Sequence, residues 1–232
     1  MAALSELIIV PCHGLFNPIA RLSINSTTAE STKYGDVDAD WYNLPHFLKG
    51  HTKTLVKHIE AGCRIARENP QALVVFSGGS TNPNTVLSEG DGYWLLAQAR
   101  DILPSFAKNQ IPDGELTREA ELDDSNHSNH NHAWYRAVSE VYALDSFQNL
   151  LFSVERYREV TGRQFPDKIT IVGYEFKQHR FVNVHAPAVF DHYGLKIEDD
   201  GSYQFNAQDG KLVYQGIDPE AIASDDPMMA NR

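Results

Sequence analysis

The residues Ser77, Gly78 and Gly79 follow an apolar run, and their types suit the binding of an anion. Glycines leave backbone N–H groups uncovered, and such groups before a helix attract negative charge. Lys177 and Arg180, far along the chain, would add formal charge, and an arginine can hold a phosphate or carboxylate through two hydrogen bonds. The alternative is that the two glycines only permit a tight turn.

Two further residues have side chains that can move protons. His13 directly follows an apolar run, a suitable position for a general acid or base, although it could instead order the first loop. Glu140 could act as a base, hold a ribose hydroxyl, or pair with Arg180 in a structural bridge. We therefore name His13 and Glu140 as candidate catalytic residues.

A third group of polar residues opens the best-defined helix of the chain. Asp145 stands at the N-cap position, and it is followed by Ser146 and, about one turn later, by Asn149. Gly162 supplies the C-terminal stop of the same helix. Ser146 and Asn149 are therefore candidate ligand contacts where this helix meets the preceding strand.

These residues are placed by the elements around them. Four runs are short and apolar, which is typical of strands buried on both faces of a parallel sheet. They are residues 7–10, 73–76, 135–140 and 168–174, and residues 195–198 are a candidate fifth strand. Helical patterns accompany them at 47–68, 88–103, 145–162 and 177–193, the last of them interrupted at Pro187.

Strands that alternate with helices form right-handed βαβ units. The sequence therefore predicts an α/β fold of three layers, with an open, doubly wound, mostly parallel sheet of about five strands between helices. In such sheets, ligands bind outside the carboxyl ends of the strands. Because the polar residues named above follow strands, we expect them to converge at that edge.

Two long segments interrupt this alternation, and a third follows it. Residues 14–44 and 109–133 are polar and too long for ordinary connections, so we treat them as insertions in one domain of residues 1–198. Residues 199–232 predict a hairpin around Asp209-Gly210 and a frayed tail.

The second insertion is rich in histidine. His127, His130 and His132 have a spacing that suits no single face of a helix or strand, and their neighbours are Asn, Ser and Asp. We expect a solvated loop there and no metal site.

Composition limits the classes of partner. The chain has 232 residues, a formal net charge of −11 and a pI of about 5.3, which argues against nucleic acid or an anionic membrane as its main partner. No segment approaches the roughly 20 apolar residues that span a bilayer, and the N-terminus shows no basic leader. With only Cys12 and Cys63, the default is a reducing cytosol. We expect a cytoplasmic protein whose partner is a small molecule.

The common glycine motifs are absent from the sequence. No GxGxxG follows the first predicted strand, and neither GxxxxGK[ST] nor GxSxG occurs anywhere. A standard dinucleotide enzyme, P-loop NTPase or α/β-hydrolase is therefore disfavoured.

The chain resembles the SanA/ElyC/YdcF-like family, a widespread domain of unknown function, and more closely its eukaryotic branch. The resemblance rests on "IIVPCHG", "FSGGSTNP", "LSEG", "ALDSFQNLLFSVERYREVTG" and "ITIVGYEFKQHRFVNVH". It implies a Rossmann-like fold with a pocket at the strand ends, and S-adenosylmethionine is among the adenosine-containing ligands suspected for the family.

The resemblance also assigns residues by position. It implies that Glu89 is the family's acidic residue after the glycines and that Ser146 and Asn149 are its Ser-x-x-Asn helix start. Lys177 and Arg180 fall on the motif that ends in arginine. Bacterial members tend to carry histidine where Lys177 stands, so a mechanism that depends on that histidine would not transfer.

We expect an enzyme that binds a small anionic, nucleotide-like or phosphorylated metabolite and catalyses hydrolysis or group transfer. The alternatives are a non-catalytic module for a nucleotide or S-adenosylmethionine-type metabolite, and a scaffold that uses its acidic loops. Substrate, reaction and oligomeric state stay open, and the sequence requires no metal. The candidate ligand-binding residues are Ser77, Gly78, Gly79, Glu89, Ser146, Asn149, Lys177 and Arg180.

Overall fold

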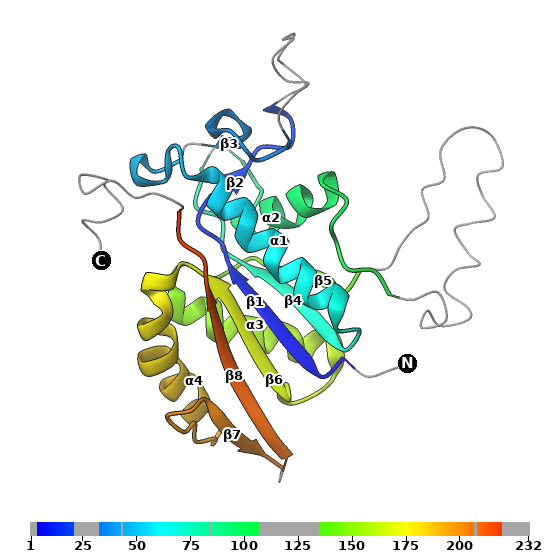
Figure 1. Ribbon diagram of the computed structural model, residues 1–232, viewed down its shortest axis with the longest axis vertical. Coiled ribbons are helices and arrows are strands. Elements are labelled where there is room, and N and C mark those ends of the chain that lie inside the picture. Colours follow the sequence, from blue (N-terminus) through cyan, green and yellow to red (C-terminus); the bar gives the residue numbers. More distant parts are fainter. Residues whose placement is uncertain are drawn as a thin grey trace, which may run out of the picture.

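A mostly parallel sheet forms the centre of the computed structural model, which describes residues 4–20, 33–42, 44–83, 85–106, 135–206 and 208–219. The sheet has six strands in the order β5-β4-β1-β6-β8-β7 (Figure 1). Every neighbouring pair is parallel except β7 and β8, so the predicted α/β sheet is confirmed. The strands are β1 (Glu6–Pro11), β4 (Ala72–Ser77), β5 (Ala137–Glu140), β6 (Lys168–Gly173), β7 (Ser202–Phe205) and β8 (Gln208–Gly216).

Helices cover both faces of the sheet, as the three-layer prediction requires. In Figure 1, α1 (Thr52–Glu68) crosses in front of the sheet and α3 (Ser146–Thr161) lies behind it. The helix α2 (Glu89–Ala99) packs in the same core as α1, and α4 (Ala186–His192) packs in the same core as α3.

The central strand β1 supplies side chains to both cores. Ile8 and Val10 pack with α1 and α2, whereas Leu7 and Ile9 pack with α3 and α4. This alternation follows from the period of two along a strand, and all four side chains are buried. Burial on both faces explains why the run contains no polar residue.

The hairpin expected after residue 199 belongs to the main sheet. The strand β8 pairs in parallel with β6, and β7 pairs antiparallel with β8. Asn206, at the turn, has a φ of 50°, which asparagine tolerates better than most residues. Asp209 and Gly210 lie inside β8, so the turn is displaced from the predicted place. The candidate strand at 195–198 is only an isolated bridge between Ile197 and Tyr203.

The described part of the first insertion is folded against α2. The short strands β2 (Leu15–Phe16) and β3 (Trp41–Tyr42) form an antiparallel ladder, and Phe16 and Trp41 are buried. The 3-10 turn η2 (Asp38–Asp40) directly precedes β3, and a second 3-10 turn, η3 (His46–Leu48), follows the insertion.

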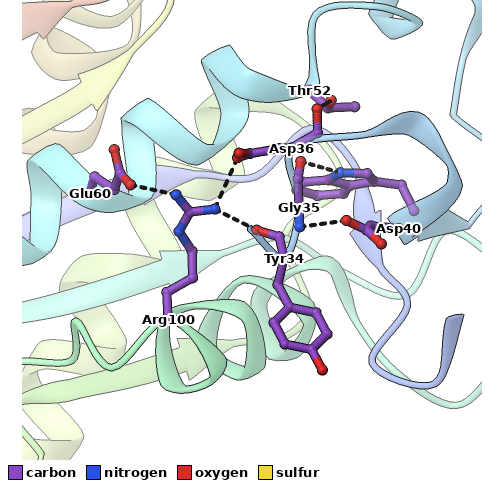
Figure 2. A network of polar contacts seen from close by, with 8 residues as sticks. Tyr34, Gly35, Asp36, Asp40, Thr52, Glu60 and Arg100 are labelled. Carbon is purple, nitrogen blue, oxygen red and sulfur yellow. Dashed lines mark hydrogen bonds and ion pairs between the residues drawn. The ribbon is translucent and has the colours of Figure 1, made fainter. Parts of the chain in front are cut away.

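Arg100 anchors this insertion to the helices (Figure 2). Its guanidinium donates to Asp36 Oδ1 at 3.0 Å, to Glu60 Oε1 at 2.8 Å and to the Tyr34 carbonyl at 2.5 Å. Within the same segment, the Gly35 amide donates to the Asp40 carboxylate at 2.8 Å. The network holds residues 34–40 against the two helices, and Phe47 and Leu48, which come later in the chain, line the cavity described below.

The second insertion and its three histidines lie outside the described residues, so the expectation of a solvated loop there stays a prediction. Within the described ranges, no helix is long and apolar enough to cross a membrane.

Candidate functional site

A cavity of about 580 Å³ lies where β1, β4 and β6 end and α3 begins. Its lining comes from segments that are far apart in the sequence, and seven of the predicted site residues line it. They are His13, Gly78, Glu89, Ser146, Asn149, Lys177 and Arg180. Ser77, Gly79 and Glu140 do not line this cavity.

Lys177 and His13 meet inside the cavity. Lys177 Nζ lies 3.4 Å from His13 Nδ1. Burial lowers the pKa of His13 well below its usual value, and Lys177 and His58 lower it further. The imidazole is therefore neutral at pH 7 and can accept a proton. Its backbone amide donates to the Tyr93 hydroxyl at 3.2 Å, so the residue also orders the first loop.

Lys177 and Arg180 place two positive charges in one cavity. Burial and, to a smaller extent, the charge of Arg180 lower the pKa of Lys177, and Glu89 opposes them, so that the pKa is about 8. Neither cation forms an ion pair with a carboxylate anywhere in the described residues. The carboxyl groups of Glu89 and Asp145 also line the cavity and offset part of this charge. A bound anion would reduce the repulsion that remains between the two cations.

Glu89 adds a carboxyl group to the same cavity. Its Oε1 accepts a hydrogen bond from Thr81 Oγ1 at 2.9 Å. Burial raises the pKa of Glu89, whereas the Thr81 hydrogen bond and Lys177 lower it. A carboxyl group in such surroundings can exchange a proton near neutral pH more readily than an exposed one.

Gly78 and Gly79 do not present their amides to a ligand, contrary to the prediction. The Gly78 amide donates to the Glu140 carbonyl at 3.0 Å, and the Gly79 amide donates to the Ala143 carbonyl at 2.6 Å. Their carbonyls accept from the amides of Gly90 and Glu89 at the start of α2. Glycine is needed at position 78 because the chain is crowded there. A Cβ atom on Gly78 would lie 2.8 Å from the Cβ atom of Cys12.

Glu140 holds the strand ends together and does not reach the cavity. Its Oε2 accepts from Ser77 Oγ at 2.5 Å, and its Oε1 accepts from the amides of Tyr142 and Ala143 at 2.6 and 3.1 Å. Asn149 Nδ2 completes this buried brace by donating to the Ser77 carbonyl at 2.9 Å. The geometry thus assigns Glu140 and Ser77 a positioning role, in place of the catalytic and ligand-binding roles predicted for them.

Ser146, which lines the cavity, forms a hydrogen bond with His185. Ser146 Oγ lies 2.8 Å from His185 Nε2. In the sequence, His185 lies eight residues after Lys177, about two turns of an α-helix, and the prediction from this spacing is that it packs or caps. The chain over Arg180–His185 is instead a π-helix, η6, preceded by the 3-10 turn η5 (Glu175–Lys177). Bonding from i to i+5 brings residues five apart nearly onto one side.

Pro187 explains this irregular helix. A proline has no N–H group, and its ring clashes with the carbonyl four residues before it. The amide of Ala186 donates to the Phe181 carbonyl, five residues back, in keeping with the wider turn. Pro187 was the signal in the sequence, and the predicted interruption there is confirmed.

The chain resembles an uncharacterised yeast protein. It is 29% identical over 228 residues to "Uncharacterized protein YOR238W" of Saccharomyces cerevisiae, an alignment that covers 93% of this chain and 68% of the yeast protein. No family model matches the sequence. No solved structure is significantly similar to it.

A larger hollow of about 810 Å³ runs along the outer edge of β5 and includes Glu140. In this hollow, side chains already donate hydrogen bonds to backbone carbonyls at the edge of β5. Trp94 Nε1 donates to the Ala137 carbonyl at 3.0 Å, and Arg156 Nε donates to the Ser139 carbonyl at 3.2 Å. These contacts block an incoming strand, so the hollow at the strand ends is the better candidate site.

Metal ligands are not clustered at either hollow. In the ranges that the structure describes, no three His, Cys, Asp or Glu side chains are grouped so that they could hold a metal ion.

Proposed function

We propose that this protein is an enzyme that binds a small phosphorylated or nucleotide-like anion in the cavity at the carboxyl ends of β1, β4 and β6 and catalyses its hydrolysis or group transfer. The observation that carries this proposal is the pair of cations, Lys177 and Arg180, which share the cavity and form no direct ion pair with a carboxylate in the described part of the chain. Arginine offers a phosphate group several donors in a fixed geometry.

The rest of the cavity suits the non-ionic part of such a ligand. Phe47, Leu48 and Phe176 line it beside the polar residues. Tyr174 and Phe176 stack with ring centroids 5.3 Å apart, which gives the wall an aromatic surface. A planar base can stack on such a surface while its phosphate lies at the cations. Adenine nucleotides and S-adenosylmethionine are therefore suitable first probes.

A catalytic role is supported by titratable groups at the cavity. His13 is neutral at pH 7, Lys177 has a pKa of about 8, and the pKa of Glu89 is raised. Burial is the largest cause in all three. Perturbed values in one cleft are a feature of active sites. Hydrolysis and group transfer both require proton donors and acceptors of this kind.

The alternative, a binding module without catalysis, also has an observation in its favour. The amides of Gly78 and Gly79 are occupied by carbonyls, so this turn offers no donors to stabilise charge that develops in a transition state. The two proposals agree on ligand binding and differ on turnover of the bound compound.

The arginine is the first residue to test. In a thermal-shift screen of inorganic phosphate, phosphate monoesters, nucleotides and S-adenosylmethionine, we expect a phosphate-containing compound to raise the melting temperature of the wild type. Arg180→Ala should weaken binding of that compound by at least about tenfold, because it removes a charge-assisted hydrogen bond.

A matched control removes the same charge elsewhere. Arg64 is half-exposed on α1 and pairs with Glu68, outside the cavity. Arg64→Ala should leave ligand affinity unchanged. Equal affinity of the wild type and Arg180→Ala for every stabilising compound would refute the proposed anion site, and binding without any turnover would favour the binding module.

The compartment can also be proposed. Cys12 and Cys63, the only cysteines of the chain, are both buried and free. This state fits a reducing compartment such as the cytosol.

A further inference from the structure

We propose that Ser146 is a nucleophile and that His185 is its general base, so that the cavity transfers a phosphoryl group by way of a phosphoserine intermediate. This inference rests on the proposed function, because the anion at Lys177 and Arg180 is the substrate's phosphate. The substrate of this reaction is a phosphate ester.

The contact between the two residues has the geometry that the step requires. Ser146 is the first residue of α3, it lines the cavity, and its Oγ lies 2.8 Å from His185 Nε2. Nucleophile and base must lie within about 2.6–3.2 Å of each other for direct proton transfer. Phe147 and Phe181 contact the imidazole edge to face, with centroids 5.8 and 5.7 Å away, and so restrict its rotation.

The charges around His185 keep it ready to accept a proton. Burial lowers its pKa, Arg180 lowers it further, and Asp145 opposes both. The imidazole is therefore mainly neutral at pH 7. Asp145, the N-cap of α3, stabilises the imidazolium that forms when the serine proton arrives.

The π-helix joins base and anion site. Arg180 begins η6 and His185 ends it, so the wider turn brings the cation and the base toward one side. Lys177 and Arg180 line the cavity, and His185 reaches it through its hydrogen bond with Ser146. π-helical turns are frequent at functional sites.

The chemistry balances with water as the only co-reactant. Ser146 Oγ bonds to phosphorus as the bond from phosphorus to the substrate alcohol breaks. The serine proton passes to His185 Nε2, which then protonates the leaving alkoxide. A water molecule next attacks the phosphoserine and gives a proton to His185. That proton returns to Ser146 Oγ as the phosphate leaves.

An uncharged phosphorylating reagent tests the pair separately from the anion site. Diisopropyl fluorophosphate should modify the wild type once, at Ser146, as intact mass and peptide mapping will show. Ser146→Ala should prevent the labelling. His185→Gln retains an amide oxygen that can accept a hydrogen bond from Ser146 Oγ but cannot take up its proton, so it should slow the labelling at least about 100-fold. Far-UV circular dichroism will verify that both variants fold.

Two further variants separate the possible failures. Ser202 also has a hydroxyl bonded to a side chain, that of Asp200, and it is distant in sequence; Ser202→Ala should label like the wild type. Arg180→Ala should still be labelled although it binds phosphate poorly. A wild type that binds phosphate but is not labelled at Ser146, or a His185→Gln variant labelled at the wild-type rate, would overturn the nucleophile. Labelling without any anion binding would instead overturn the proposed function on which this inference rests.

Discussion

The charge of Lys177, a residue of the candidate site, lowers the stability of the folded protein. Its folded-state pKa is about 8, whereas an unfolded lysine titrates near 10.5. Burial is the main cause, since a charged amine loses water contacts when the chain folds. Below pH 8 the amine is protonated in both states, so the full penalty for burying the charge is present at neutral pH.

Replacing this charge should therefore stabilise the protein. The shift corresponds to at most about 3 kcal/mol, and we expect Lys177→Met to raise the free energy of unfolding at pH 7 by about 1–3 kcal/mol. The variant should at the same time lose affinity for the anionic ligand. Urea denaturation at pH 7 measures the first effect, and titration with inorganic phosphate measures the second.

The pH dependence supplies the control for this substitution. Between pH 8 and 10.5 the unfolded wild type binds more protons at Lys177 than the folded protein does, so this residue makes stability rise with pH. Cys12 and Cys63, whose pKa values are raised by burial, act in the opposite direction above about pH 9. The informative quantity is the difference between the variant and the wild type, which should shrink from pH 8 to 9.5. A constant difference would show that folding does not lower the pKa of Lys177.

Which site residues converge could be predicted, but what each one does could not. His13, Lys177 and Arg180 follow buried strands, and parallel strands deliver their ends to one edge. The role of Glu140 depended on amides two and three residues ahead and on a serine in another strand. Such partners are fixed by tertiary packing, which no local pattern records. His185 was missed because an α-helical period was assumed over a π-helical stretch.

At the scale of elements, one arginine connects the first insertion to two helices. The Arg100 side chain is 8% exposed, whereas its partners Asp36 and Glu60 are 23% and 42% exposed. Loss of the guanidinium would leave two carboxylates and the Tyr34 carbonyl without this donor (Figure 2). Because these partners are partly hydrated, the cost is smaller than for a fully buried ion pair.

Arg100→Met should lower the free energy of unfolding by about 2 kcal/mol. Arg64→Met makes the same chemical change at an exposed pair on α1, and it should cost less than about 0.5 kcal/mol. We also expect faster amide hydrogen exchange at residues 33–42 in Arg100→Met alone. Equal stability losses in the two variants would contradict an anchoring role for Arg100.

The sequence patterns predicted elements better than connections. The β-branched runs identified β1, β4 and β6 because burial on both faces requires apolar residues throughout. The edge of the sheet was harder to foresee. Lys211, Leu212 and Val213 of β8 pair with β6 through backbone groups, which every residue carries. The position of the turn at Asn206 was also not predicted, because Asp209-Gly210 fits a strand as well as a turn here.

For the molecule as a whole, the site depends on groups buried beneath it. His58 is fully buried in α1, and its Nε2 lies 2.8 Å from the Ile217 carbonyl just after β8. A carbonyl only accepts, so Nε2 carries a hydrogen, and the ring is neutral at pH 7 because burial lowers its pKa. His58 also contacts Tyr174 edge to face, with centroids 4.7 Å apart, directly under the cavity. This histidine therefore links helix, sheet and site.

Acid should consequently unfold the protein through His58. Burial lowers its pKa to about 4, against the usual 6.5, and Lys177 contributes in the same direction. Stability from this group is complete above pH 6.5 and is lost as the pH falls toward 4, by up to about 3 kcal/mol. His58→Gln keeps a donor for Ile217 but does not titrate, so its free energy of unfolding should fall less steeply between pH 6.5 and 4.5. His13 adds a second component of the same sign, so part of the slope should remain.

The exposed His192 provides the control, because His192→Gln should keep the wild-type slope. If urea denaturation gave parallel pH profiles for His58→Gln and the wild type, the neutral buried imidazole would not be the source of the acid sensitivity.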